Sequence, residues 1–186
     1  MKLNFLSLPA LFQALSITLI SSICVDFASA EIPSNTREAK IVQVIDGDTV
    51  IVELDRQREH LRMIGIDTPE SRPNKRSQRQ AADRHIDQKT ILQLGRRSSD
   101  HTRALLPKKS LVRLEFDVER RDHYGRLLAY IWIPNQGRGE SKMANEEILS
   151  AGYAYPLSVP PNLKYREKFG RAFKEARQAK RGLWER

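Results

Sequence analysis

The stretch Leu61–Glu70 reads L-R-M-I-G-I-D-T-P-E, and it decides how the rest of the chain is interpreted. Residues 61–66 alternate in the manner of a β-strand. The strand is expected to end at D-T-P-E, because Pro69 lacks the N–H group that a strand ladder needs and favours an extended conformation at Thr68. A rigid strand with Arg62 on its flank and two carboxylates at its tip suits a phosphate and a metal ion that prefers oxygen ligands. Taken alone, however, the stretch is better explained as an edge strand that ends in an ordinary turn.

Residues 1–30 are typical of a secretory signal peptide. Lys2 precedes an apolar run, and small residues end at Ala30, so we expect cleavage after Ala30 and a secreted or periplasmic protein without stable membrane association. The alternative is an uncleaved anchor, but polar residues interrupt the apolar run and a membrane-spanning helix needs about 20 mostly apolar residues. Cys24, the only cysteine, leaves with this segment, so the mature chain is expected to contain no disulfide.

The composition is strongly basic. The formal net charge is +9 and the sequence pI is about 9.9. In an exported protein this excess indicates an anionic partner, which composition leaves open among nucleic acid, anionic lipid and a cell-wall polymer. Residues 31–38 are expected to be a flexible lead-in. Residues 39–186 are long enough for one domain with its own core, and nothing in the sequence calls for more than a monomer.

Patterns of β-branched and alternating residues predict five strands. The first three are consecutive and form an antiparallel meander, with a tight turn at Asp46-Gly47 whose residues tolerate positive φ. In the fourth strand we expect the apolar residues from Val112 to Val118 to face the core and the charged residues between them, Glu115 included, to face solvent. The predicted strands are Lys40–Ile45, Thr49–Leu54, Leu61–Ile66, Leu111–Val118 and Leu127–Ile133.

Helical patterns follow the third and the fifth strands. In the cationic segment at residues 71–94, a helix is expected to begin at a capping box between Ser77 and Gln80, and Gly95 is expected to interrupt it. The further predicted helices are Arg96–Leu106, Ser141–Ala151, which Gly152 ends in the left-handed conformation, and the amphipathic Leu163–Arg181. Strands and helices in this order predict an α+β fold, a five-stranded Greek-key barrel of the OB type with about three helices.

Three charged motifs lie in separate parts of the predicted barrel. Residues 45–50 read I-D-G-D-T-V, residues 62–70 read R-x-x-x-x-D-T-P-E, and residues 122–131 read D-x-Y-G-R-x-L-A-Y-I. Each motif is modest alone, but together and in this order they resemble the thermonuclease (staphylococcal nuclease) family. The resemblance extends from Ala39 to Arg186, and the fold of that family, an OB barrel with three helices, agrees with the fold predicted from the strand and helix patterns.

The resemblance implies a role for each matching residue. The implied calcium ligands are Asp48, Asp67 and the backbone carbonyl of Thr68, the implied general base is Glu70, the implied phosphate clamps are Arg62 and Arg126, and Tyr124 is implied to lie along the bound nucleotide. These residue types suit those tasks, because Ca²⁺ takes carboxylate, carbonyl and water oxygens and a planar guanidinium meets two phosphate oxygens at once. Considered singly, each residue also has an ordinary interpretation, such as a turn aspartate or a solvated arginine.

The activity that the resemblance implies is that of an exported, calcium-dependent endonuclease that hydrolyses DNA and RNA and leaves 3′-phosphates. Little sequence preference is expected where cations grip the backbone, because phosphates carry no sequence information. Two alternatives stay open at this point. One is a non-catalytic OB-fold module that binds nucleic acid, and the other is a barrel that binds an anionic surface polymer.

The chain departs from the best-known member of the family in two places. The segment 71–94 is longer and more basic, and it forms either a cationic lip over the substrate groove or a solvated insert. The tyrosines expected around the nucleotide phosphate are replaced by P-L-S-V-P-P-N, with Tyr153 and Tyr155 slightly earlier, which leaves their contact with substrate open. The histidines show no metal-ligand spacing, and Trp132 and Trp184 are expected in the core.

Overall fold

The computed structural model describes residues 31–135 and 140–185 of the chain. The strands are β1 (Arg37–Asp46), β2 (Thr49–Leu54), β3 (Gln57–Met63), β4 (Ile66–Asp67), β5 (Leu111–Glu115), β6 (Leu127–Ile133), β7 (Lys142–Met143) and β8 (Tyr155–Pro156). The helices are α1 (Lys75–Arg84), α2 (Gln88–Leu105), α3 (Ala144–Ser150), α4 (Arg166–Gln178) and a final 3-10 turn, η1 (Gly182–Trp184). The predicted signal peptide lies outside the described residues.

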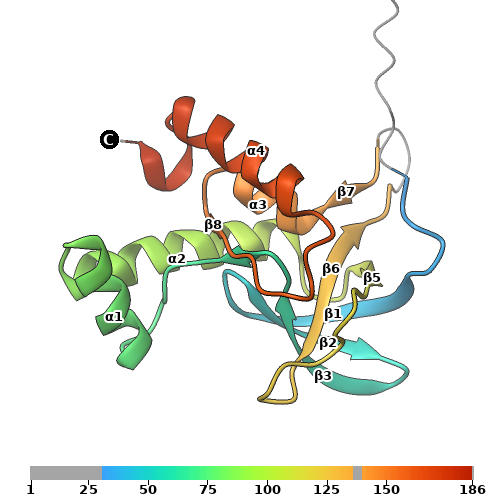
Figure 1. The fold of residues 1–186 in the computed structure, drawn as a ribbon. Coiled ribbons are helices and arrows are strands. Elements are labelled where there is room, and N and C mark those ends of the chain that lie inside the picture. Colours follow the sequence, from blue (N-terminus) through green and yellow to red (C-terminus); the bar gives the residue numbers. More distant parts are fainter. Residues whose placement is uncertain (1–30, 136–139, 186) are drawn as a thin grey trace, which may run out of the picture.

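Five of the strands close into a barrel. The main sheet runs in the order β3-β2-β1-β5-β6-β7, and a parallel pairing of β3 with β6 closes it. In that pairing Leu61 lies opposite Leu127, and Met63 lies opposite Ala129. Figure 1 shows α3 and α4 above the barrel, and α2 running out to the left with α1 at its far end. The predicted five-stranded OB-type α+β fold is confirmed, although the described residues form four α-helices where about three were expected.

The barrel interior is built from the alternating apolar residues of its strands. Val50 and Val52 on β2, Leu61 on β3 and Ile131 on β6 are completely buried. β6 is buried along most of its length because α3 packs against it, and α4 packs against α3. The predicted bounds of the strands now labelled β2 and β6 are the observed ones, whereas β1 extends beyond its predicted range at both ends.

The stretch Leu61–Glu70 does not form one continuous strand. β3 ends at Met63, and the chain turns at Gly65, which has a φ of +81°. Only glycine fits there, because a Cβ atom would lie 2.3 Å from the ring of Phe169 in α4. β4 then pairs with β8, so the D-T-P-E turn is held outside the barrel by a separate two-stranded sheet.

The prediction that Glu115 faces solvent is wrong. β5 ends at Glu115, whose side chain is completely buried, whereas Val118, which was expected in the core, is 71% exposed. Glu115 accepts hydrogen bonds from Trp132 Nε1 (2.7 Å) and the Tyr165 hydroxyl (3.0 Å). It also pairs with Lys164. These donors come from β6 and from the residues before α4, so the alternation within β5 could not reveal a buried carboxylate.

The turn between β1 and β2 is tight, as expected, but it does not use positive φ. Asp46 pairs with Thr49, so Gly47 and Asp48 form the turn, and none of the residues from Asp46 to Asp48 has a positive φ. Gly47 is needed for space instead, because a Cβ atom there would lie 2.8 Å from the side chain of Thr68. The first hairpin and the D-T-P-E turn are therefore in direct contact.

The boundary between the first two helices also differs from the expected one. α1 begins at Lys75, is capped by Asn74, and ends where His85 takes the left-handed conformation. α2 then runs through Gly95 without interruption. Glycine is needed inside this helix, because a Cβ atom at Gly95 would lie 2.2 Å from the backbone oxygen of Glu70. α2 therefore lies directly against the D-T-P-E turn.

The two C-terminal helices follow the predicted order. Gly152 takes the left-handed conformation after α3, with a φ of +79°, as expected. α4 is shorter than the predicted helix, and its buried face consists of Phe169, Ala172 and Ala176, as the amphipathic pattern indicated. Within the ranges 31–135 and 140–185, none of the helices has the length and apolar character needed to cross a membrane.

We expect Gly95→Ala to destabilise the protein, because the added methyl group must push α2 away from the backbone of Glu70. The loss in the free energy of unfolding should be about 1–3 kcal/mol, the range for an overpacked core, as measured by urea denaturation.

Gly170→Ala is the matched control for this prediction. Gly170 also lies inside a helix, α4, but nothing lies within 4 Å of the position of its Cβ atom. There the higher helix propensity of alanine should stabilise the protein by up to about 1 kcal/mol. Equal effects of the two substitutions would contradict the close approach of α2 to the turn.

Candidate active site

Arg62 is the buried centre of the candidate site. It lies on β3, and 8% of its side chain is exposed. Its Nη2 atom lies 3.2 Å from Asp48 Oδ2 and 3.1 Å from Asp67 Oδ1. Its Nη1 atom donates to the backbone oxygens of Met63 and Ile66. The first two sequence motifs therefore meet in space, with one carboxylate of each converging on a single nitrogen.

Asp48 joins the first hairpin to the D-T-P-E turn. Its Oδ2 atom accepts hydrogen bonds from the backbone N–H (2.9 Å) and the hydroxyl (3.0 Å) of Thr68. Its Oδ1 atom accepts a hydrogen bond from the hydroxyl of Thr49 (3.0 Å). Asp48 is buried, so these donors and Arg62 satisfy its carboxylate within the protein and fix its position.

Gln80 on α1 fixes the same turn from another side. Its Oε1 atom accepts a hydrogen bond from the backbone N–H of Glu70 (2.9 Å), and its Nε2 atom donates to the backbone oxygen of Thr68 (3.2 Å). The predicted capping box between Ser77 and Gln80 is therefore wrong. The observed capping box joins Asn74 to Ser77, and Gln80 is buried. No local pattern signals the role of Gln80, because its partners lie on a distant turn.

Glu70 lies beside Arg76, an arginine of the cationic segment 71–94 for which no role was predicted. Its Oε1 atom lies 3.2 Å from Arg76 Nε, and its Oε2 atom accepts a hydrogen bond from Asn74 Nδ2 (2.8 Å). Arg76 also pairs with Asp67. Burial raises the pKa of Asp67 by more than the neighbouring Arg76 lowers it, and burial likewise raises the pKa of Glu70. The site thus contains two partly buried carboxyl groups, and a nearby cation stabilises their charged forms.

A cleft of about 650 Å³ opens beside these residues. The carboxylates of the site do not line the cleft themselves, but they form ion pairs with Arg62 and Arg76, which do. The basic residues that line it are Arg62, Arg76, Arg121 and Arg126. Arg126 immediately precedes β6, in which Leu128 is the partner of Arg62 across the β3–β6 pairing. Closing the barrel thereby brings the third motif beside the first two.

The third motif supplies one wall of the cleft. Arg126 Nε donates to Asp122 Oδ2 (2.7 Å), and although burial opposes it, this bond holds the pKa of Asp122 below its usual value. Tyr124 is 74% exposed, and its ring centre lies 5.5 Å from the guanidinium carbon of Arg126. The ring of His123, a residue without an assigned role, lies 3.7 Å from the ring of Tyr124 and also lines the cleft. An exposed aromatic ring beside cations suits the face of a nucleotide base.

Neither Tyr153 nor Tyr155 lines this cleft. The ring of Tyr153 stacks on His101 at 4.4 Å, and the ring of Tyr155 lies 4.0 Å from the guanidinium carbon of Arg84. The part of the cleft wall that follows β8 is formed by Leu157, Val159, Pro160 and Asn162. The tyrosines that precede the P-L-S-V-P-P-N stretch are thus occupied by other partners in the structure.

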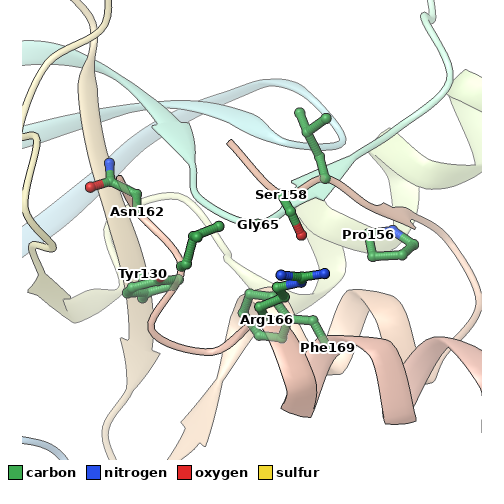
Figure 2. Close-up of a pocket in the computed structure, with 9 residues that line it drawn as sticks. Gly65, Tyr130, Pro156, Ser158, Asn162, Arg166 and Phe169 are labelled. Carbon is green, nitrogen blue, oxygen red and sulfur yellow. The ribbon is translucent and has the colours of Figure 1, made fainter. Parts of the chain in front are cut away.

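A second pocket, between β6 and α4, is much smaller (Figure 2). Its volume of about 10 Å³ is at the limit for a single water molecule. Figure 2 shows Tyr130, Arg166 and Phe169 around it, with Gly65 beside them. This pocket belongs to the packing of the Gly65 turn on α4, and we assign no substrate to it.

The oxygen donors beside Arg62 fit a calcium ion that keeps part of its water shell. In the part of the chain that the structure describes, no three acidic, histidine or cysteine side chains are placed to hold a metal ion by themselves. Asp48, Asp67 and the carbonyl of Thr68 are nevertheless hard oxygen donors on adjoining turns, and a carbonyl bonded to Gln80 keeps a second lone pair. Ca²⁺ takes about 6–8 oxygen ligands and accepts waters among them.

Comparison with known proteins decides the family. A family model described as "Staphylococcal nuclease homologue" matches residues 60–186. The thermonuclease of Staphylococcus hyicus is 37% identical over 152 residues, which cover 81% of this chain and 78% of that protein. The chain belongs to the staphylococcal nuclease family. Other relatives are the thermonuclease of Staphylococcus intermedius (37% identical, 78% and 75% covered) and endonuclease YncB of Bacillus subtilis (31% identical, 82% and 66% covered).

As a member of the staphylococcal nuclease family, the protein is a nuclease, a phosphodiester hydrolase that acts on nucleic acid. The family resemblance drawn from the three motifs is therefore confirmed. The arginine-lined cleft agrees with a polyanionic substrate, because guanidinium groups meet phosphate oxygens with good geometry.

We expect Gln80→Leu to destabilise the D-T-P-E turn, because a leucine of similar size leaves the Glu70 N–H and the Thr68 carbonyl without their partner. The cost in the free energy of unfolding should be about 1–3 kcal/mol, measured by urea denaturation, and the nuclease rate should fall with it.

Gln78→Leu is the control for this prediction, since Gln78 is an exposed glutamine on the same helix. That substitution should change the free energy of unfolding by less than about 0.5 kcal/mol. Similar losses in both variants would show that Gln80 does not hold the turn.

Proposed function

We propose that the protein is an exported, calcium-dependent endonuclease that hydrolyses DNA and RNA with little sequence preference and leaves 3′-phosphate products. The observation that carries the proposal is the convergence of Asp48 and Asp67 on Arg62, at the edge of a cleft lined by arginines. Family membership supports the nuclease chemistry and, since this family is generally metal-dependent, the requirement for a metal ion. Export rests on the signal-peptide pattern of residues 1–30.

In this proposal Asp48, Asp67 and the Thr68 carbonyl would hold the ion, which would supply positive charge against the phosphate and a site for a water. Glu70 accepts a proton from the attacking water, whose oxygen forms a bond to phosphorus. The P–O5′ bond breaks, and the leaving oxygen takes a proton from solvent to give a 5′-hydroxyl. The 3′-phosphate stays on the other fragment.

The two arginines proposed to clamp the phosphate have different roles. Arg62 already pairs with two aspartates and donates to two backbone carbonyls, so it acts on the phosphate mainly through its charge. Arg126 is more exposed, with 28% of its side chain accessible, and it is held in place by Asp122. Its guanidinium is oriented toward the cleft before substrate binds, which suits the stabilisation of charge that develops in the transition state.

The cleft explains the proposed lack of sequence preference. Its cations recognise the backbone, which is common to all sequences, and the exposed ring of Tyr124 offers a face on which any base can stack. Binding of either nucleic acid should therefore weaken steeply as salt rises.

Glu70→Gln should abolish most of the activity, because the amide cannot accept the proton from the attacking water. We expect the rate of single-stranded DNA cleavage in calcium to fall by about 10²–10⁴-fold, measured together with end-group analysis of the products. Removal of calcium with a chelator should stop cleavage by the wild-type protein.

Glu53→Gln serves as the control, because Glu53 is an exposed carboxylate on β2. It should cleave at the wild-type rate. Tight, salt-sensitive binding without cleavage in any divalent ion would instead favour the non-catalytic binding module, and 5′-phosphate ends would contradict the proposed bond cleavage.

Arg126→Lys should reduce the cleavage rate by about 10²–10³-fold, the usual cost of losing one electrostatic stabiliser of the transition state. A lysine keeps the charge but loses the planar fork that meets two phosphate oxygens. The comparison is with Arg103→Lys, which alters an arginine paired with Asp100 on α2, outside this cleft. Comparable rates for the two variants would remove Arg126 from the proposed mechanism.

A further inference from the structure

Arg76 is a cation of the site that the family motifs do not contain. It lies in the first turn of α1, pairs with Asp67, and has its Nε atom 3.2 Å from Glu70 Oε1. Its side chain is 45% exposed and lines the cleft, whereas the side chains of Asp67 and Glu70 are 19% and 16% exposed. One guanidinium therefore bridges the proposed metal ligand and the proposed general base.

The surrounding charges explain why an arginine occupies this position. Although burial opposes it, the nearby carboxylates, Asp67 foremost, hold the pKa of Arg76 above its usual value. Within α1 itself the position is unfavourable, since the first turn carries Lys75 and Arg76 and no acidic residue, and a cation there opposes the helix dipole. The pairing with carboxylates outside the helix offsets this effect.

Asn74 completes the connection between α1 and the acidic residues. Its side chain caps the helix by accepting a hydrogen bond from the backbone N–H of Ser77 (2.7 Å), and it donates to Glu70 Oε2 (2.8 Å). The start of α1 is thus bonded to Glu70 through Asn74 and to both acids through Arg76. The basic segment that distinguishes this chain is therefore built into the candidate site at its first helical turn.

We propose that Arg76 is a positioning residue of the nuclease site: it holds Asp67 and Glu70 together, and its positive charge opposes the binding of a divalent cation at Asp67. The inference rests on the proposed function, because it takes Asp67 as a metal ligand. Arg62 and Arg76 both contact Asp67 at Oδ1, so a divalent cation that binds this carboxylate lies beside the Arg76 guanidinium and is repelled by its positive charge. Arg76 also lines the cleft with Arg62, where the phosphate backbone would bind in the proposed function.

The test is calcium titration of the purified protein by calorimetry, without nucleic acid. Arg76→Ala should bind calcium about fivefold more tightly than the wild type, on the scale of one charge interaction at a partly exposed site. Arg76→Lys should lie between the two, because lysine keeps the charge without the planar fork. Arg79→Ala, which removes an exposed cation from the same helix, should change the affinity by less than about twofold.

Thermal unfolding gives a second readout. In chelator, Arg76→Ala should have a lower Tm than the wild type, and saturating calcium should narrow the gap, because the ion then replaces the lost positive charge. A Tm deficit that is unchanged by calcium would identify an ordinary structural ion pair and overturn the inference.

The outcomes separate this inference from the proposed function. Unchanged or weaker calcium affinity in Arg76→Ala, with a wild-type protein that binds calcium and cleaves DNA, overturns the role of Arg76 alone. A wild-type protein that neither binds calcium nor cleaves nucleic acid overturns both.

Discussion

The burial of one guanidinium, that of Arg62, is the constraint on which the site depends. A buried cation must be paired and hydrogen-bonded, because its desolvation is otherwise too costly. The structure meets this requirement with the carboxylates of Asp48 and Asp67 and with the backbone oxygens of Met63 and Ile66. These partners lie on the β1–β2 turn and on both sides of the Gly65 turn. Satisfying a single side chain therefore fixes the relative positions of all the segments that carry the acids.

Barrel closure supplies the other half of the site. Without the parallel β3–β6 pairing, β3 would be an edge strand and the motif that contains Arg126 would have no fixed relation to Arg62. The cleft lies where these two strands meet, and the Gly65 turn at its edge is seated against the ring of Phe169 on α4. The C-terminal helix thus supports a turn of the site without contributing a side chain to the cleft.

Local periodicity and motif order were enough to predict the OB-type barrel, the bounds of β2 and β6, and the residues that meet around Arg62. The errors concern residues whose role lies in a distant contact. Glu115 has the position of a solvent-facing residue in an alternating strand, yet its donors lie on β6 and before α4. Gln80 has the spacing of a capping partner, yet it bonds to the D-T-P-E turn. Gly95 has the character of a helix breaker, yet it gives that turn room to approach α2. None of these contacts leaves a local signal.

The two aspartates of the site differ in a way that motif comparison does not reveal. Asp48 is held by the N–H and hydroxyl of Thr68 and by the hydroxyl of Thr49 as well as by Arg62, whereas Asp67 is held by Arg62 and Arg76. Pulling a carboxylate away from buried neutral donors leaves those donors unsatisfied, at a cost of about 1–3 kcal/mol each. Both arginines contact Asp67 at Oδ1, so the other carboxylate oxygen can accept a cation without the loss of either pair. Asp48 is therefore the fixed point of the site, and Asp67 is the carboxylate that can take a further positive charge.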